Sequence, residues 1–188
     1  MKQGELYTAD ELLKKALRYK GYWGSKGGIT VSGGEPLLQM DFLTEFFKKA
    51  KAEGVHTNLD TSGNPFTDQE PWHSGWLELM KYTDLVMLDI KQIDEQEHIK
   101  LTGHSNKNIL AMARELSDMK KPVWIRHVLV PGGSDKDEYL HRLADFIHTL
   151  SNVERVEVLP YHTLGKFKWE NLGLSYPCLL YTSPSPRD

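Results

Sequence analysis

The sequence predicts an α/β fold built on five parallel strands, arranged as a barrel or as an open sheet. Strand-like runs begin at residues 29, 55, 85, 123 and 153. The 26 to 38 residues between successive starts leave room for the helical crossover that parallel neighbours need. The runs at 85–88 and 123–125 are apolar at every position, which is typical of a sheet covered on both faces.

Five segments have the apolar spacing of helices that flank such a sheet. Residues 8–19 open with Thr8 and Glu11, the pattern of a capping box, and end before Gly21. Residues 38–54 gather phenylalanines on one face and lysines on the other. The remaining helices are expected at 75–82, 106–119 and 136–150.

The composition excludes several classes of function. The chain has 188 residues, enough for one domain, and a net charge of −3, which does not provide the basic surface of a nucleic-acid-binding protein. No run approaches the roughly 18 apolar residues of a membrane span. We therefore expect a soluble cytoplasmic protein with no nucleic-acid or membrane partner. The single cysteine, Cys178, excludes an intrachain disulfide and any site that needs two thiolates from this chain.

Ligands of parallel α/β folds bind at the carboxyl ends of the strands, so the first two strand ends are candidate sites. The first strand is followed by Gly33 and Gly34, which let the backbone approach a ligand; an ordinary turn also explains an isolated glycine pair. The second strand ends in Asp60, which could orient a ligand amine, hold a cation, or cap the following turn.

Charged side chains within the third and fourth strands are a stronger signal. Met87, Asp89 and Lys91 alternate with apolar residues, so one face presents a thioether, a carboxylate and an ammonium group. Such charges are costly unless they are paired or bound to a ligand, and a structural Asp89–Lys91 pair is the alternative. Arg126 suits a fixed anion. His162 follows the fifth strand, where a lone histidine is more often structural.

Three of these segments carry a resemblance to a known family. Gly-Gly-Glu-Pro at 33–36 indicates only the radical S-adenosylmethionine (SAM) superfamily. Asp-Leu-Val-Met-Leu-Asp at 84–89 and Pro-Tyr-His-x-Leu-Gly-Lys-x-Lys-Trp at 160–169 resemble the pyruvate formate-lyase-activating enzymes of that superfamily. The resemblance runs from about residue 5 to Pro177 and includes the segments 28–36, 56–63, 84–91, 123–126 and 159–169.

The resemblance implies a fold and a reaction. The fold is a partial (β/α)6 barrel, in which a [4Fe–4S] cluster reductively cleaves SAM. The resulting 5′-deoxyadenosyl radical removes hydrogen from a glycine of pyruvate formate-lyase and leaves a glycyl radical. A flavodoxin or ferredoxin is the implied electron donor, and the enzyme is expected to be a monomer.

The resemblance also assigns roles to particular residues. Arg126 is the implied catalytic residue, in the barrel lumen near the incoming glycine loop. A monovalent cation beside the SAM carboxylate is expected to bind Asp60, Thr61, Met87 and Asp89. The residues implied to bind SAM are Gly33, Gly34, Glu35, Asp89, Ile90, Lys91 and His162.

Two departures from the family pattern qualify this interpretation. The family holds its cluster on a Cys-x-x-x-Cys-x-x-Cys loop after the first barrel strand, and this chain contains no such loop. We therefore expect an incomplete barrel domain over residues 1–177, with five of the six strands, in a fragment that is inactive alone. Residues 178–188 resemble translated sequencing-adaptor read-through and are expected to be disordered.

Three alternatives remain open from the sequence. One is a non-catalytic barrel that keeps SAM and partner binding without the redox centre. Another is an activase of a different glycyl-radical enzyme. The third is an unrelated cation-dependent barrel enzyme, such as a lyase, that uses Asp60, Asp89 and Lys91.

Overall fold

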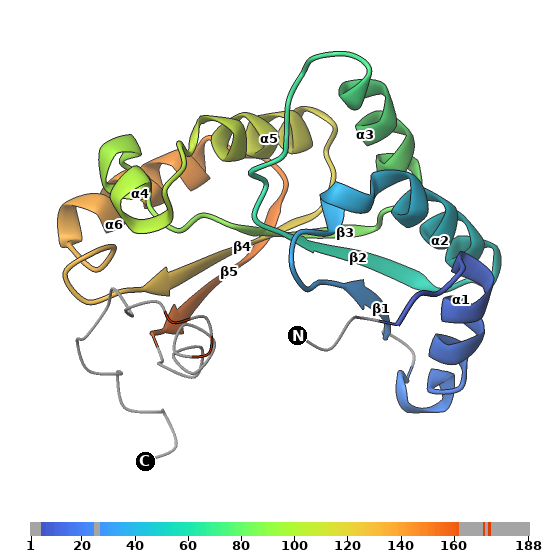
Figure 1. Ribbon diagram of the computed structural model, residues 1–188. Helices are drawn as coiled ribbons and strands as arrows, with labels where there is room; N and C mark the ends of the chain where they lie inside the picture. The colour runs from blue at the N-terminus through green and yellow to red at the C-terminus, as the bar shows by residue number, and fades with distance from the viewer. Residues whose placement is uncertain (1–4, 25–26, 162–170, 172, 174–188) are drawn as a thin grey trace.

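The computed structural model describes residues 5–24, 27–161, 171 and 173, and it contains one curved, fully parallel sheet (Figure 1). The strands follow one another in chain order across the sheet, so each connection joins adjacent neighbours. This confirms the predicted α/β class with five parallel strands. The strands are β1 (Gly28–Val31), β2 (His56–Thr61), β3 (Leu85–Asp89), β4 (Val123–Leu129) and β5 (Val153–Pro160).

Helices cover the outer face of the sheet. They are α1 (Ala9–Leu17), α2 (Met40–Ala52), α3 (Trp72–Lys81), α4 (Glu95–Thr102), α5 (Lys107–Asp118) and α6 (Asp137–His148). Short 3-10 helices, η1 (Lys20–Tyr22) and η2 (Pro36–Gln39), extend the loops around α1 and β1. The helices lie along one side of the curved sheet in Figure 1. The expectation of a sheet covered on both faces is therefore wrong for the described residues.

The hydrophobic core lies between the helices and the outer face of the sheet. Leu59, Val86, Leu88 and Ile125 point from neighbouring strands into it, and each is fully buried. The intervening residues face the concave side, where polar atoms replace apolar ones: Asn58 donates to the Thr30 hydroxyl at 3.2 Å. The alternation of the strands thus separates a largely apolar outer face from a concave face that is polar towards the carboxyl ends of the strands.

Local signals explain where the helices begin and end. Thr8 and Glu11 form both halves of the predicted capping box at the start of α1. The predicted helix at 75–82 is wrong at its start, because α3 already begins at Trp72. Helix α4 has no counterpart among the predicted helices; His98 is its only buried residue, so it lacks an apolar stripe.

Within the described ranges, every helix is too short or too polar to cross a membrane. The proposed tail at 178–188 and the strand-end residue His162 lie outside the described residues. The expected domain boundary at residue 177 also falls outside them, so it stays a prediction.

Candidate ligand-binding site

The carboxyl ends of β1, β2, β3 and β4 surround a cavity of about 260 Å³. Seven of the predicted site residues line it, together with two serines that were not predicted. The strand order explains this meeting, because parallel neighbours deliver their carboxyl ends to the same edge of the sheet. The lining residues are Ser32, Gly33, Gly34, Asp60, Thr61, Ser62, Asp89, Lys91 and Arg126.

Gly33 and Gly34 form the part of the cavity wall that has no side chains. Their φ angles are +91° and +54°, in the left-handed region that side chains rarely adopt. No atom beyond their chain neighbours lies within 4 Å of the position that a Cβ would take at either residue. Conformation, rather than crowding, therefore requires glycine here, and the turn leaves its backbone open to a ligand.

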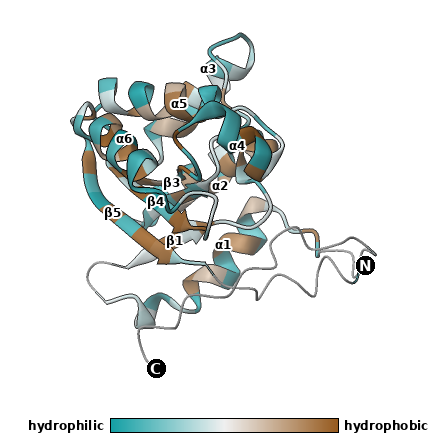
Figure 2. Cartoon of the chain, turned by 90° about the vertical axis from the view of Figure 1, so that its left-hand side faces the viewer, coloured by the Kyte–Doolittle hydropathy of each residue, from teal (hydrophilic) through white to brown (hydrophobic). Residues whose placement is uncertain are grey.

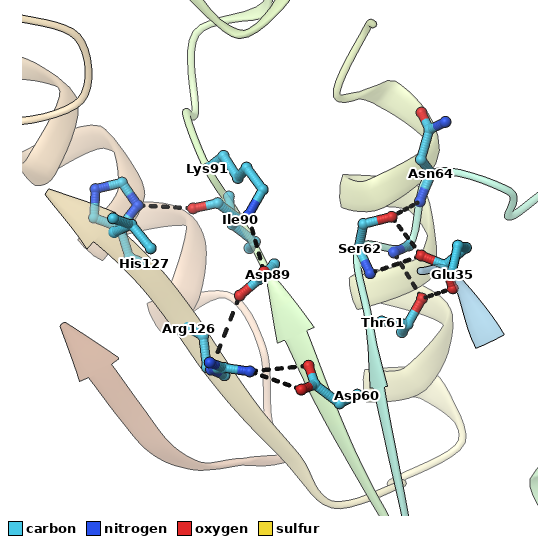
Figure 3. Close-up of polar contacts among 12 residues, drawn as sticks. Glu35, Asp60, Thr61, Ser62, Asn64, Asp89, Ile90, Lys91, Arg126 and His127 are labelled. Atoms are coloured by element: carbon cyan, nitrogen blue, oxygen red, sulfur yellow. Dashed lines mark hydrogen bonds and ion pairs between the residues drawn. The ribbon is translucent and has the colours of Figure 1, made fainter. Parts of the chain in front are cut away.

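The Glu35 carboxylate joins the loops that follow β1 and β2 (Figure 3). Oε1 accepts from the Leu37 N–H at 3.2 Å and the Thr61 hydroxyl at 2.6 Å. Oε2 accepts from the Ser62 N–H at 3.0 Å and the Ser62 hydroxyl at 2.6 Å. Both oxygens are engaged within the chain, so the side chain acts here as a clamp between two loops. Its predicted contact with SAM stays a prediction.

Arg126 lies between two carboxylates in the cavity (Figure 3). Its Nη1 donates to both carboxylate oxygens of Asp60 at 2.9 Å, and its Nε lies 4.0 Å from Asp89 Oδ1. Lys91 Nζ lies 2.9 Å from the other Asp89 oxygen. The Asp89–Lys91 pair is therefore present, and Asp60 pairs across the sheet with Arg126. Two acids and two bases make the group formally neutral.

The structure does not bring Met87 into this cavity. Its sulfur accepts from Asn58 Nδ2 at 2.9 Å, and Met87 lines a separate cavity of about 730 Å³ towards the amino ends of the strands. The register still pairs Met87 with Asp60 on the neighbouring strand. Asp60 is engaged by Arg126 here, and the expected cation site stays a prediction. Among the described residues, no group of three or more His, Cys, Asp or Glu side chains is arranged to hold a metal ion.

Ile90 is fully buried, with its side chain in the core, so its side chain faces away from the cavity. Its backbone is also occupied: the N–H donates to the Arg126 carbonyl at 2.9 Å, and the carbonyl lies 2.7 Å from His127 Nδ1 (Figure 3). The backbone of Ile90 therefore fixes β3 against β4 beside the cavity, and its predicted SAM contact stays a prediction.

Sequence reasoning missed a smaller cavity of about 140 Å³ that adjoins the first and shares Ser62, Asp89 and Lys91 with it. His98 of α4 lines this cavity and is 2% exposed. Its Nδ1 lies 2.7 Å from the His104 carbonyl, whereas its buried Nε2 has no partner among the described residues. Asp89, Lys91 and the position of Ser62 after a strand pointed to this edge of the sheet. No sequence signal pointed to His98, which lies on a helix that lacks an apolar stripe.

The sheet is curved and fully parallel, and a cavity of mixed charge lies at the carboxyl ends of its strands. These two features are typical of ligand-binding α/β proteins with a partial-barrel fold. The sequence profile of the Radical SAM superfamily matches residues 1–144. The pyruvate formate-lyase-activating enzyme of Streptococcus mutans is 55% identical over 179 residues, which are 95% of this chain and 68% of that protein. The enzyme of the same name from Staphylococcus epidermidis is 58% identical over 170 residues, 90% of this chain and 68% of that protein.

Solved structures agree with these relatives. A domain of the pyruvate formate-lyase-activating enzyme from Bacteroides vulgatus superposes with a TM-score of 0.64 at 29% identity, over 72% of this chain and 81% of that one. SuiB from Streptococcus suis, solved with S-adenosylmethionine, shares the fold with a TM-score of 0.65 at 18% identity, over 81% of this chain and 33% of that one. The chain belongs to the radical SAM superfamily and, within it, to the family of pyruvate formate-lyase-activating enzymes.

Family membership confirms the predicted resemblance and excludes the alternative of an unrelated cation-dependent lyase. It also implies SAM and a [4Fe–4S] cluster as cofactors of the superfamily. The residues of this chain do not fit the cluster, because its only cysteine is Cys178 and such a cluster needs several thiolates. They do fit SAM: the cavity offers an open glycine backbone, two carboxylates and an ammonium group. It also offers a buried Arg126 Nε that has no hydrogen-bond partner among the described residues.

Proposed function

We propose that residues 1–177 form the SAM-binding part of a pyruvate formate-lyase-activating enzyme, which generates a glycyl radical on pyruvate formate-lyase. The observation that carries the proposal is the single cavity in which Gly33, Gly34, Asp89, Lys91 and Arg126 meet. These residues come from three strand ends, and they meet in a chain that is 55–58% identical to activating enzymes. The proposed location is the cytoplasm.

The charges of the cavity suit the methionyl end of SAM, which carries an ammonium and a carboxylate. In the proposal the Gly33–Gly34 turn and Asp89 bind the ammonium group, and Lys91 binds the carboxylate. The other two residues proposed to bind SAM are Ile90, through its backbone, and His162. Glu35 holds the glycine turn in place through Thr61 and Ser62. Bound SAM supplies the 5′-deoxyadenosyl group that the family uses to abstract hydrogen.

Arg126 is the residue proposed to meet the protein substrate. Its guanidinium lies on the concave face of the sheet, and its buried Nε has no hydrogen-bond partner within the described part of the chain. A guanidinium there can donate to a peptide carbonyl of an incoming glycine loop. Pyruvate formate-lyase is the proposed partner of a monomeric enzyme, and a flavodoxin or ferredoxin is the proposed electron donor.

The cysteine count favours a second candidate, a barrel that binds SAM and a partner without redox chemistry. Both candidates predict SAM binding and, because the cluster thiolates are lacking, no glycyl radical formed by this chain alone. The second also predicts that this chain keeps its docking face, so retention of pyruvate formate-lyase in a pull-down supports the second and failure to retain it supports the first. Retention of a different glycyl-radical enzyme, with none of pyruvate formate-lyase, would instead reassign the substrate.

Calorimetric titration with SAM tests the proposed binding site. Among the described residues, Lys91 supplies the one ammonium group that lines the cavity, and Lys91→Met removes it. Lys136→Met removes an exposed lysine of the β4–α6 connection. We expect Lys91→Met to weaken SAM binding at least tenfold, about 1.4 kcal/mol, and Lys136→Met to leave it unchanged. Equal affinities in the wild type and Lys91→Met would contradict the assignment.

A further inference from the structure

His98 of α4 is buried beside the ligand cavity and has one ring nitrogen without a partner. Its Nδ1 lies 2.7 Å from the His104 carbonyl oxygen and 3.1 Å from the Thr102 hydroxyl. Because a carbonyl oxygen can only accept, Nδ1 carries the hydrogen, and Nε2 of the neutral ring is an acceptor. Among the described residues no group donates to Nε2, although His98 is 2% exposed. An unpaired buried acceptor costs free energy, so a donor that reaches Nε2 stabilises the site.

Lys91 is the cation that lines the same cavity as this acceptor. Both side chains line the cavity of about 140 Å³, and Lys91 also lines the adjoining cavity of about 260 Å³. The Lys91 ammonium has three hydrogens, and within the described residues its hydrogen bond goes to Asp89 Oδ2 at 2.9 Å (Figure 3). The side chain is 40% exposed, so it has room to turn. Lys91 therefore has spare donors at the boundary between the two cavities.

The other polar side chains of the small cavity are weaker candidates for the donor. Ser62 donates its hydroxyl to Glu35 at 2.6 Å, and Thr102 donates to a backbone carbonyl of its own helix at 2.8 Å. Asn64 and the exposed His104 also line the cavity and carry N–H groups. A hydrogen bond from an ammonium group is about twice as strong as one from a neutral amide, which favours Lys91.

We propose that His98 is a positioning residue for Lys91, and that its Nε2 accepts a hydrogen bond from the ammonium group when Lys91 leaves Asp89. This inference rests on the proposed function, in which the ammonium group of SAM binds Asp89 and its carboxylate binds Lys91. Lys91 then gives one donor to SAM and another to His98, which fixes the direction of the ammonium group. His98 thus acts on SAM through Lys91.

Nitrogen-15 NMR of histidine-labelled protein observes Nε2 directly, because an accepted hydrogen bond moves the resonance of an unprotonated imidazole nitrogen upfield. His98→Leu assigns the resonance. Asp89→Asn removes the charge that holds Lys91, so we expect an upfield shift of His98 Nε2 in this variant without SAM. Adding Lys91→Met should abolish the shift, whereas adding Asn64→Ala, the matched control, should leave it unchanged.

An unchanged Nε2 resonance in folded Asp89→Asn would overturn the proposal. A shift that survives Lys91→Met, or that Asn64→Ala abolishes, would also overturn it, because the donor would then be another group. The wild type with saturating SAM should show the same shift, and this comparison decides the matter if Asp89→Asn does not fold. If SAM does not bind the wild type, the proposed function fails while the result for Asp89→Asn stands.

SAM titration tests whether His98 acts through Lys91. His98→Leu should weaken SAM binding about fivefold in the wild-type background, the effect of losing one hydrogen bond. In the Lys91→Met background the same change should weaken binding less than about twofold, because the residue through which His98 acts is already absent. An equal loss in both backgrounds would show that His98 supports the fold alone, and this result would contradict the proposal.

Discussion

Glu35 binds four donors of its own chain, and this links two loops that would otherwise be independent walls of the cavity. Its neighbours in sequence, Gly33 and Gly34, have open backbone but no side chains to fix them. The geometry of the glycine turn therefore depends on the Glu35 carboxylate. A carboxylate suits this place because it accepts at two oxygens and donates at neither.

Glu35→Gln tests the clamp. An amide keeps one acceptor oxygen and turns its NH₂ group towards donors, so about two of the four hydrogen bonds are lost. We expect a loss of about 1.5–3 kcal/mol in the free energy of unfolding and a weaker affinity for SAM. Chemical denaturation and SAM titration measure the two effects. Glu138→Gln on exposed α6 is the control, and a Glu35 variant as stable as this control would contradict the clamp.

Asp84 makes stability depend on pH. Burial opposes ionisation of its carboxyl, but a hydrogen bond from Lys51 and another from the Thr57 N–H outweigh burial, so its pKa lies below the ordinary value of 3.8. Because the pKa is lower in the folded state, the ionised carboxylate stabilises the fold at pH values above the pKa of the unfolded state. This contribution is lost as the pH falls through the pKa of the folded state.

Asp84→Asn should therefore cost about 1.5–3 kcal/mol at pH 7 and progressively less as the pH falls below 4. Urea unfolding at a series of pH values measures the difference from the wild type. Asp118→Asn, an exposed aspartate at the end of α5, serves as the control. A deficit for Asp84→Asn that stays constant down to pH 2 would show that the carboxylate charge is not responsible.

Some contacts of single site residues could be predicted from the sequence and others could not, and the reasons are physical. The face shared by Asp89 and Lys91 follows from the two-residue period of a strand, so it was predictable. The pairing of Asp60 with Arg126 was not, because 66 residues separate them and only the strand order brings them together. Ile90 belongs to a family motif, but strand alternation places its side chain in the core.

At the scale of elements, β5 is one of the two edges of the sheet within the described residues, with β1 at the other. Its register places Val156 and Val158 on the same face as Ile125 and His127 of β4. The two valines are 45% and 56% exposed. Figure 2 shows β5 at the outer margin of the sheet, with hydrophobic stretches along it. An exposed apolar edge strand invites pairing with another chain.

Val158→Lys should raise the soluble yield of this chain, because a charge on an edge strand opposes edge-to-edge association. The free energy of unfolding should change by about 0.5 kcal/mol or less, since the side chain is more than half exposed. Light scattering at increasing concentration measures the effect. Ile99→Lys on α4 makes the same change at a residue 38% exposed, and an equal gain from it would rule out the edge as the cause.

The elements show what periodicity can and cannot predict. Helices α1, α2, α5 and α6 present apolar faces to the hydrophobic core and were all expected from the sequence. Helix α4 was missed because it is held by its caps instead: Asp94 accepts from two N–H groups at its start, and Gly103 ends it with a φ of +81°.

At the scale of the whole molecule, the chain combines a SAM-type cavity with a single cysteine. We therefore expect iron and sulfide reconstitution of this chain to give no [4Fe–4S] cluster, because the required thiolates are lacking. Iron and sulfide analysis with absorption spectroscopy provides the measurement, and Cys178→Ser is the control that removes the only thiolate. A stoichiometric four-iron cluster on the wild-type chain would contradict this expectation.

The central claim is that the cavity at the carboxyl ends of the strands is the ligand site. Hydrogen–deuterium exchange with and without S-adenosylhomocysteine, a stable analogue of SAM, tests it directly, because it locates the bound ligand along the chain. The account predicts slower exchange at residues 32–36, 60–63 and 89–91, which line or adjoin the cavity. Ligand binding that protects only the segments around the 730 Å³ cavity, such as residues 27–30 and 154–155, would contradict it.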